Sequence, residues 1–231
     1  MSVPAGYQNW RQLLFVHWTV EALELRPLVP SCLDIDEFDG TAYVGLVPFV
    51  VEAARPLGAP REMSLRFLET NVRTYVHVHG RDHGVYFFSL DAASLLAVVG
   101  ARLGLGLPYF WASGEQHVSY TCTEYALRRR VGGTQRCNVR YRVSDFLGPA
   151  ALGTLEHFLI ERYVLHVQRG PTLWSVRVKH PPYALYAAQL LNLEDDLVSA
   201  AGLLPRVDAP LVHFAPGVDV AINAPRITIA R

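Results

Sequence analysis

Glu69, Asn71 and Arg73 occupy alternate positions in the segment SLRFLETNVRTYVHVHG, residues 64–80. A carboxylate, an amide and a guanidinium on one surface can bind an anion, orient a carbonyl group or exchange a proton. If the segment is a β-strand, the three side chains share one face, because strand side chains alternate. Their spacing leaves two interpretations open: a solvent-exposed row of charge pairs, or a polar row that lines a cavity.

The segment has the composition of a strand. It is rich in β-branched residues, and Gly80 closes the run. Alternation predicts an apolar face that carries Leu68, Thr70, Val72, Thr74, Val76 and Val78. The opposite face is predicted to carry Phe67, Glu69, Asn71, Arg73, Tyr75 and His77.

Strand-like runs dominate the rest of the chain. We predict strands at 11–18, 33–38, 41–51, 66–79, 84–90, 116–127, 136–144, 162–169, 173–180 and 218–229. Helical periodicity favours short helices at 20–29, 92–103, 153–163 and 192–202. No linker or repeat divides the sequence, so we predict one domain over residues 1–231. Many neighbouring strands with a few helices predict an α+β fold whose large, mostly antiparallel sheet curls or closes.

Charge and hydropathy exclude several classes of partner. The 21 basic and 21 acidic residues cancel, whereas nucleic acids and anionic membranes select a basic excess. The basic cluster LRRR at 127–130 is predicted to be a solvated strand end. The first residues lack a signal-peptide pattern, and no apolar stretch is long enough to span a bilayer. We therefore predict a cytoplasmic protein without a nucleic-acid or membrane partner.

Short catalytic and metal-binding motifs are missing. The three cysteines form no CxxC pair, and no nucleophile elbow, Walker loop or HExxH sequence is present. His77, His79 and His83 have a spacing that a metal could use, but they fall at a predicted hairpin tip, where polar residues are ordinary. We predict neither a metal nor a cofactor.

Longer segments resemble the YqjF-like uncharacterised bacterial family, domain of unknown function 2071. The resemblance is carried by residues 11–49, by NVRTYV (71–76), GVYFFSLDA (84–92) and GLPYFWA (106–112), and by GTLEHFLIERY (153–163) with VKHPPYALYAAQ (178–189). That family is similar to the acetoacetate-decarboxylase superfamily. The resemblance implies a closed, cone-shaped antiparallel β-barrel with flanking helices and a pocket inside, bordered by the row that begins at Glu69.

Acetoacetate decarboxylase forms a Schiff base through a buried lysine, accompanied by an arginine and two glutamates. By resemblance, Arg11 matches the arginine and Glu69 one glutamate, while Gly45 stands where the second glutamate would be. The lysines should lie in ARLGLGLPYF, residues 101–110, which contains none. The chain's one lysine, Lys179, alternates with an apolar set in the strand predicted at 173–180 and is expected to face water.

These comparisons lead us to expect a protein that binds a small carboxylate or carbonyl compound, such as a keto acid, without Schiff-base chemistry. Arg11 would pair with the anionic group, and Glu69 would orient the ligand or exchange a proton. The remaining expected ligand-binding residues are Asn71, Arg73, Tyr75, Tyr86 and Tyr109. Two alternatives stay open: a lysine-independent hydratase, isomerase or lyase with Glu69 as its catalytic acid/base, and a structural or interaction protein with a filled barrel. The resemblance also implies assembly into a homo-oligomer, although the sequence identifies no interface.

Overall fold

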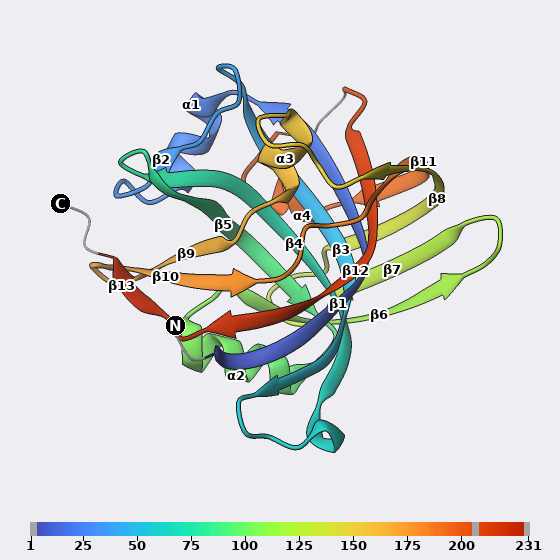
Figure 1. The fold of residues 1–231 in the computed structure, drawn as a ribbon, viewed down its shortest axis with the longest axis horizontal. Coiled ribbons are helices and arrows are strands. Elements are labelled where there is room, and N and C mark those ends of the chain that lie inside the picture. The colour runs from blue at the N-terminus through green and yellow to red at the C-terminus, as the bar shows by residue number, and fades with distance from the viewer. Residues whose placement is uncertain (1–3, 205–207, 229–231) are drawn as a thin grey trace.

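The computed structural model describes residues 4–204 and 208–228, and most of that chain belongs to one 13-stranded sheet (Figure 1). The strands are β1 (Pro4–Val20), β2 (Asp34–Ile35), β3 (Ala42–Pro56), β4 (Leu65–Val78), β5 (Arg81–Ala92), β6 (Tyr109–Val118), β7 (Thr123–Arg129), β8 (Arg136–Gly148), β9 (Val164–Arg169), β10 (Thr172–Lys179), β11 (Leu185–Asp195), β12 (Leu211–Asn223) and β13 (Arg226–Thr228). The helical segments are α1 (Ala22–Leu25), η1 (Arg26–Leu28), η2 (Arg61–Met63), α2 (Leu95–Leu105), α3 (Leu155–Ile160) and α4 (Leu197–Ala200).

The sheet is mostly antiparallel and curls back on itself. Its order is β13-β10-β9-β5-β6-β7-β8-β11-β12-β1-β3-β4-β2. Two further pairings, β4 with β5 and β10 with β12, join strands that are far apart in that order. The parallel pairs are β5–β6 and β5–β9. This curling agrees with the expectation that so large a sheet does not stay flat, and it gives the sheet an inner and an outer face (Figure 1).

Strand β1 shows why the central strands have nearly continuous apolar runs. Leu13 and Phe15 belong to one buried cluster, which we call the inner cluster. Leu14 and Val16 belong to a second cluster on the other side of the sheet. The same division holds along β3 and β4. A strand that is covered on both faces loses the simple alternation of apolar and polar residues, so its inner face is hard to recognise from sequence.

Two β-bulges reset the alternation of side chains. Gln12 in β1 has φ 54° and Ala53 in β3 has φ 50°, and the strand registers shift at both positions. An extra residue in one strand moves every following side chain to the opposite face. Trp10 and Leu13 therefore both face the inner cluster, although three positions separate them.

Most predicted elements are present, but three were wrong. The range 116–127 is not one strand, because it spans the turn between β6 and β7. The range 192–202 begins as strand β11, and only Leu197–Ala200 is helical. The strand predicted at 218–229 is divided into the end of β12 and the short β13, and residue 229 lies outside the described residues. Pro225 stands at the break, where its missing N–H ends the ladder.

The basic cluster at 127–130 was also misjudged at one residue. Arg129 is buried, with 6% of its side chain exposed, and it forms a bidentate ion pair with the fully buried Asp91 at 2.6 and 2.9 Å. Its guanidinium also lies 3.7 Å from the ring centre of Phe110.

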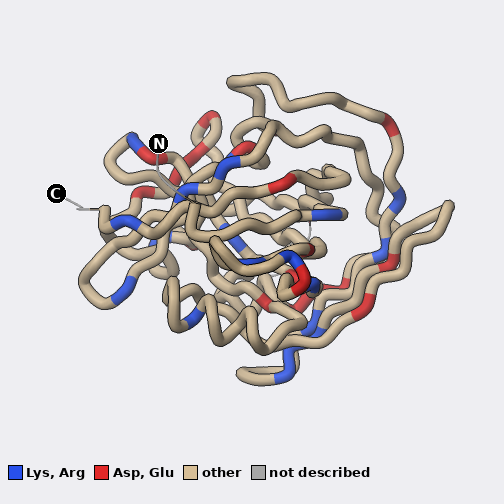
Figure 2. The backbone as a smooth tube through the Cα atoms, turned by 60° about the horizontal axis from the view of Figure 1, so that its bottom comes forward, with Lys and Arg blue, Asp and Glu red and all other residues tan. Residues whose placement is uncertain are grey.

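Elsewhere along the backbone, basic and acidic positions are interspersed (Figure 2). Among residues 4–204 and 208–228, none of the helices has the length and apolar character needed to cross a bilayer.

Candidate functional site

A cavity of about 140 Å³ lies against the inner face of the curled sheet. Its wall is mainly apolar and aromatic, with a small number of polar side chains, as is usual for small-molecule sites. The polar members are Gln8, Glu69, Asn71, Arg73, Tyr109 and Tyr183. The apolar members come from β1, β3, β5, β9, β10 and β12, from helix α2 and from the residues that follow it, and include Trp10, Phe49, Phe87, Leu90, Ala101, Leu105 and Val178.

The polar row of β4 lines this cavity. Glu69, Asn71 and Arg73 are all buried, with 4%, 5% and 9% of their surface exposed. On the opposite face of the strand, Leu68 and Val72 pack into the second apolar cluster. The two faces therefore divide as strand alternation predicts, and the row is an interior one.

Glu69 holds a proton at neutral pH. Burial raises the pKa of Glu69 from 4.5 to about 8, because a carboxylate loses its hydration there. The phenol of Tyr109 donates to Glu69 Oε2 at 2.9 Å and opposes that rise in pKa, whereas the charge of nearby Asp91 adds to it. A protonated carboxyl group that faces a cavity can donate a hydrogen bond to a carbonyl oxygen.

Arg73 brings a positive charge to the same wall. Its Nη2 donates to the carbonyl oxygen of Leu159 at 3.1 Å, and its guanidinium lies 5.6 Å from the ring centre of Phe15. Arg73 Nε and Asn71 Oδ1 are buried, and neither atom has a hydrogen-bond partner among the described residues. Within the described part of the chain, no carboxylate lies within ion-pairing distance of Arg73. The cavity therefore contains a buried, unneutralised cation, which costs free energy unless an anion joins it.

A hydrogen-bond chain beneath the cavity holds this arginine in place. The Tyr75 hydroxyl donates to the same Leu159 carbonyl at 2.7 Å, so its oxygen accepts from His17 Nε2 at 2.7 Å. Burial, with the charge of Arg73, keeps the pKa of His17 well below its ordinary value, so the imidazole is neutral. Gly45 leaves room for that ring: a Cβ there would lie 2.9 Å from His17 Cδ2. A side chain at Gly45 would therefore require the ring to shift.

Three residues expected from the sequence lie away from the cavity wall. Tyr75 shares the inner face of β4 but sits beneath the wall, with its hydroxyl engaged as described. Arg11 points to the outer face, where it is 31% exposed and pairs with Asp219 at 2.5 Å. Tyr86 packs against Phe88 at a ring distance of 5.7 Å and lines a separate hollow. Of the expected residues, the structure brings together Glu69, Asn71, Arg73 and Tyr109.

Three lining residues with polar side-chain atoms escaped the sequence analysis. Gln8 and Trp10 precede the strand predicted at 11–18, and Gln8 Oε1 accepts from Trp10 Nε1 at 2.7 Å. Since Trp10 faces inward, its neighbour Arg11 faces outward, and the bulge at Gln12 hides this alternation in the sequence. Tyr183 lies in the loop after β10, and its backbone N–H donates to Glu161 Oε1 at 2.9 Å. The surrounding sequence HPPYAL has no pattern that would predict a cavity-lining tyrosine.

Lys179 is not a member of the cavity wall. It is exposed at the end of β10, and it lines a hollow on the outer face of the sheet, while its neighbour Val178 is buried and lines the cavity. This confirms the predicted direction of the two side chains.

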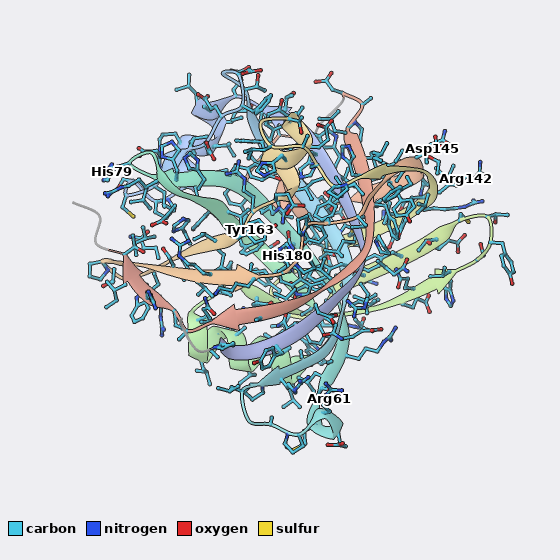
Figure 3. All side chains as sticks on the ribbon, in the orientation of Figure 1. Arg61, His79, Arg142, Asp145, Tyr163 and His180 are labelled. Carbon is cyan, nitrogen blue, oxygen red and sulfur yellow. The ribbon has the colours of Figure 1, made fainter. Side chains whose placement is uncertain are left out.

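The three histidines considered for a metal lie around the β4–β5 hairpin, with His79 at the molecular edge (Figure 3). No group of three or more side chains suited to a metal ion occurs in residues 4–204 and 208–228.

Solved structures with this fold include acetoacetate-decarboxylase-like proteins. The enduracididine biosynthesis enzyme MppR complexed with pyruvate has a TM-score of 0.68 and 15% identity, with 98% of this chain and 91% of that one covered. An acetoacetate decarboxylase-like enzyme from Sphingomonas wittichii RW1 has a TM-score of 0.66 and 13% identity, with 98% and 94% covered. At these identities the likeness establishes the fold alone.

Sequence comparison identifies the family of this chain. A family model for DUF2071, described as an uncharacterized conserved protein, matches residues 7–219. The uncharacterized protein YqjF of Bacillus subtilis (strain 168) is 35% identical over 226 residues, which cover 95% of this chain and 93% of that protein. The chain therefore belongs to the DUF2071 family, as the resemblance predicted.

Proposed function

We propose that this protein binds a small carboxylate or keto acid in the cavity, with Arg73 pairing with the anionic group. The observation that carries the proposal is the buried guanidinium of Arg73, whose Nε has no hydrogen-bond partner and which lacks a carboxylate partner in the described chain. A bound carboxylate would neutralise this charge and supply the missing acceptor. Asn71 offers a second unsatisfied atom beside it.

The state of Glu69 favours the same ligand. With a pKa of about 8, Glu69 is neutral near pH 7 and does not repel an incoming anion. Its proton can be donated to the carbonyl oxygen of a keto acid, while Arg73 holds the carboxylate. Tyr109, which donates to Glu69, fixes the direction of that carboxyl group.

The size of the cavity limits the ligand. An apolar cavity of about 150 Å³ holds one benzene molecule, which has six heavy atoms. The cavity of about 140 Å³ suits a ligand of that size. Pyruvate, which also has six heavy atoms, is bound by the MppR enzyme of the same fold.

We further propose that residues 1–231 form one domain and that the sheet encloses this cavity as a cone-shaped barrel.

A Schiff-base mechanism does not fit this cavity. The chain's only lysine lies on the outer face, so no lysine amine is available among the cavity-lining residues to form an imine with a keto acid. We therefore propose that the protein is not an acetoacetate decarboxylase.

A lysine-independent enzyme is the second candidate. A carboxyl group with a pKa of about 8 can both give and take a proton near neutral pH, which is the property that general acid/base catalysis needs. Such an enzyme would hydrate or isomerise a carbonyl compound held by Arg73. It predicts that Glu69→Gln abolishes turnover while the ligand still binds.

Thermal unfolding with a panel of keto acids, other carboxylates and aldehydes tests the proposal. A ligand at about a hundred times its Kd stabilises the folded state by about 2.7 kcal/mol, which raises Tm by about 5 to 10 °C in a chain of this size. We expect at least one carboxylate to produce such a shift. Its shift should shrink above pH 8, where ionised Glu69 repels the anion.

Two arginine variants decide which residue pairs with the ligand. Arg73→Gln should abolish the ligand-induced shift, whereas Arg11→Gln should retain it, because Arg11 pairs with Asp219 on the outer face. Comparing each variant with and without ligand separates binding from any loss of stability. The opposite pattern would move the anion site to Arg11. Absence of any shift across the panel would favour the alternative of a structural protein with a filled barrel.

A further inference from the structure

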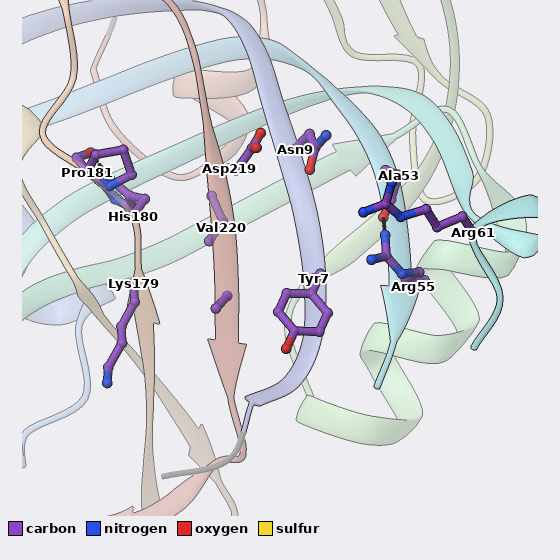
Figure 4. A pocket seen from close by; sticks show the side chains of 11 residues that line it. Tyr7, Asn9, Ala53, Arg55, Arg61, Lys179, His180, Pro181, Asp219 and Val220 are labelled. Carbon is purple, nitrogen blue, oxygen red and sulfur yellow. Dashed lines mark hydrogen bonds between the residues drawn. The ribbon is translucent and has the colours of Figure 1, made fainter. Parts of the chain in front are cut away.

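A second hollow, of about 720 Å³, lies on the outer face of the sheet (Figure 4). It is lined by Tyr7, Asn9, Ala53, Arg55, Arg61, Lys179, His180, Pro181, Asp219, Val220 and Ala221. We call it the outer cleft. Its side chains come from β10, β12, β1 and β3, four strands that are neighbours in the sheet, and from the adjoining η2. The inner faces of those four strands contribute to the cavity wall, so the two sites lie back to back.

A strained bulge turns one of the cleft's cations outward. Ala53 has φ 50°, a left-handed conformation that is uncommon for a residue with a side chain. This extra residue lets Ala54 pack against the inner cluster and places Arg55 in the outer cleft. Arg55 lies over the ring of Tyr7, 5.4 Å from its centre. Bulges of this kind re-aim side chains at functional sites.

Positive charge in the outer cleft is not neutralised. Arg55, Arg61 and Lys179 line it, although the chain as a whole has no net charge. Asp219, the acidic residue of the lining, is engaged with Arg11 at 2.5 Å. Across residues 4–204 and 208–228, no carboxylate lies within ion-pairing distance of the three cations. A concave surface with charge of one sign concentrates ligands of the opposite sign.

The cations stand at two ends of the cleft. Lys179 lies on one side, Arg55 and Arg61 lie on the other, and the ring of Tyr7 lies between them (Figure 4). Arg61 is carried by the η2 loop, which projects from the sheet (Figure 3). We propose that the outer cleft is a second binding site, for an elongated dianion with an oxyanion group at each end and an apolar middle over Tyr7.

Titration calorimetry with a series of linear dicarboxylates, from four to ten carbons, tests this proposal in low-salt buffer. Acetate serves as the monoanion, pyrophosphate as a compact polyanion, and an alkane bisphosphonate of the best length as a second oxyanion. Low salt matters because the Debye length is about 10 Å at 0.1 M ionic strength and exposed charges are screened beyond it. We expect one intermediate length to bind most tightly, and acetate to bind at least tenfold more weakly.

Charge-removing variants identify the two ends. Lys179→Gln and Arg61→Gln should each weaken binding of the best dicarboxylate about fivefold and remove the preference for its length, since one exposed ion pair contributes about 1 kcal/mol. Arg81→Gln, the same change at an exposed arginine at the start of β5, should leave the affinity within twofold. Neither Lys179 nor Arg61 lines the cavity, so a loss of binding in these variants separates this site from the cavity.

Three outcomes would overturn the proposal: no measurable binding by any probe, equal affinity for acetate and the dicarboxylates, or an equal loss in Arg81→Gln. A chemical measurement on the unaltered protein gives an independent check. Lys179 is the only lysine, so acylation of its amine can be followed by mass spectrometry of one peptide. The best dicarboxylate should slow that acylation at least threefold relative to acetate, and equal rates would again refute the site.

Discussion

Replacement of Glu69 by glutamine should change how the stability of this protein depends on pH. In the folded chain the pKa of Glu69 is about 8, against 4.5 for the ordinary group. Between these two values the folded state keeps the proton that the unfolded chain has lost. The folded state therefore binds more protons, and the free energy of unfolding falls as pH rises. Glutamine resembles the protonated side chain and has no proton to lose in this range.

The size of the effect follows from the two pKa values. The full difference between about 8 and 4.5 corresponds to about 5 kcal/mol, at 1.36 kcal/mol per unit of pKa. Between about pH 5.5 and about pH 7.5, the wild-type protein should lose about 2 to 3 kcal/mol from this group alone. That loss corresponds to about 5 to 10 °C in Tm for a chain of this length.

Denaturant unfolding at half-unit steps from pH 5 to pH 9 provides the assay. Other groups also titrate: burial raises the pKa of Asp195 to about 6, and it lowers the pKa of His166 and His213. The informative quantity is therefore the difference between wild type and Glu69→Gln at each pH, in which those contributions cancel. Glu62→Gln, the same change at an exposed residue, is the matched control.

The reasoning makes a specific demand on that difference curve. Glu69→Gln should gain stability relative to wild type steadily from pH 5 to pH 8 and then level off, while Glu62→Gln stays parallel to wild type. A Glu69→Gln curve that is parallel to wild type over this range would show that the carboxyl group is already ionised, and both the neutral-acid argument and the proposed proton donation would be lost.

Three further predictions concern the neighbours of the cavity. Tyr109→Phe removes a hydrogen bond that lowers the pKa of Glu69, so the pH at which the difference curve levels off should move upward. Gly45→Ala places a Cβ 2.9 Å from the buried imidazole of the adjacent strand β1 and should cost about 1 to 3 kcal/mol in urea unfolding; no loss would mean that the ring can shift. Arg129→Met leaves Asp91 buried without its partner, which should cost about 3 to 5 kcal/mol in urea unfolding near pH 7; a loss below about 1 kcal/mol would mean that the pair adds little to stability.

The sequence by itself determined the local features of this protein. The β-branched run with alternating polar residues fixed β4 and the common face of Glu69, Asn71 and Arg73, because a strand has a period of two. The family also followed from sequence, since motifs along most of the chain carry it. The outward direction of Lys179 followed from the same alternation in β10.

Only the tertiary structure decided which polar residues meet. The bulge at Gln12 turns Trp10 inward and Arg11 outward, and a one-residue shift of this kind leaves no clear trace in a sequence. Strand β11 was missed because its register with β8 shifts at several points and because exposed and partly buried residues are mixed along it. Both features weaken the two-residue alternation that indicates a strand.

Burial settled the chemistry as well. The sequence alone does not distinguish Glu69, with a pKa of about 8, from an exposed glutamate. The pKa is raised because the surrounding strands exclude water from the carboxyl group. The same holds for Arg73, whose lack of a counter-ion among the described residues can be recognised only when every neighbour is in place. Alternation placed these groups on one face, and the curling of the sheet made that face the wall of a cavity.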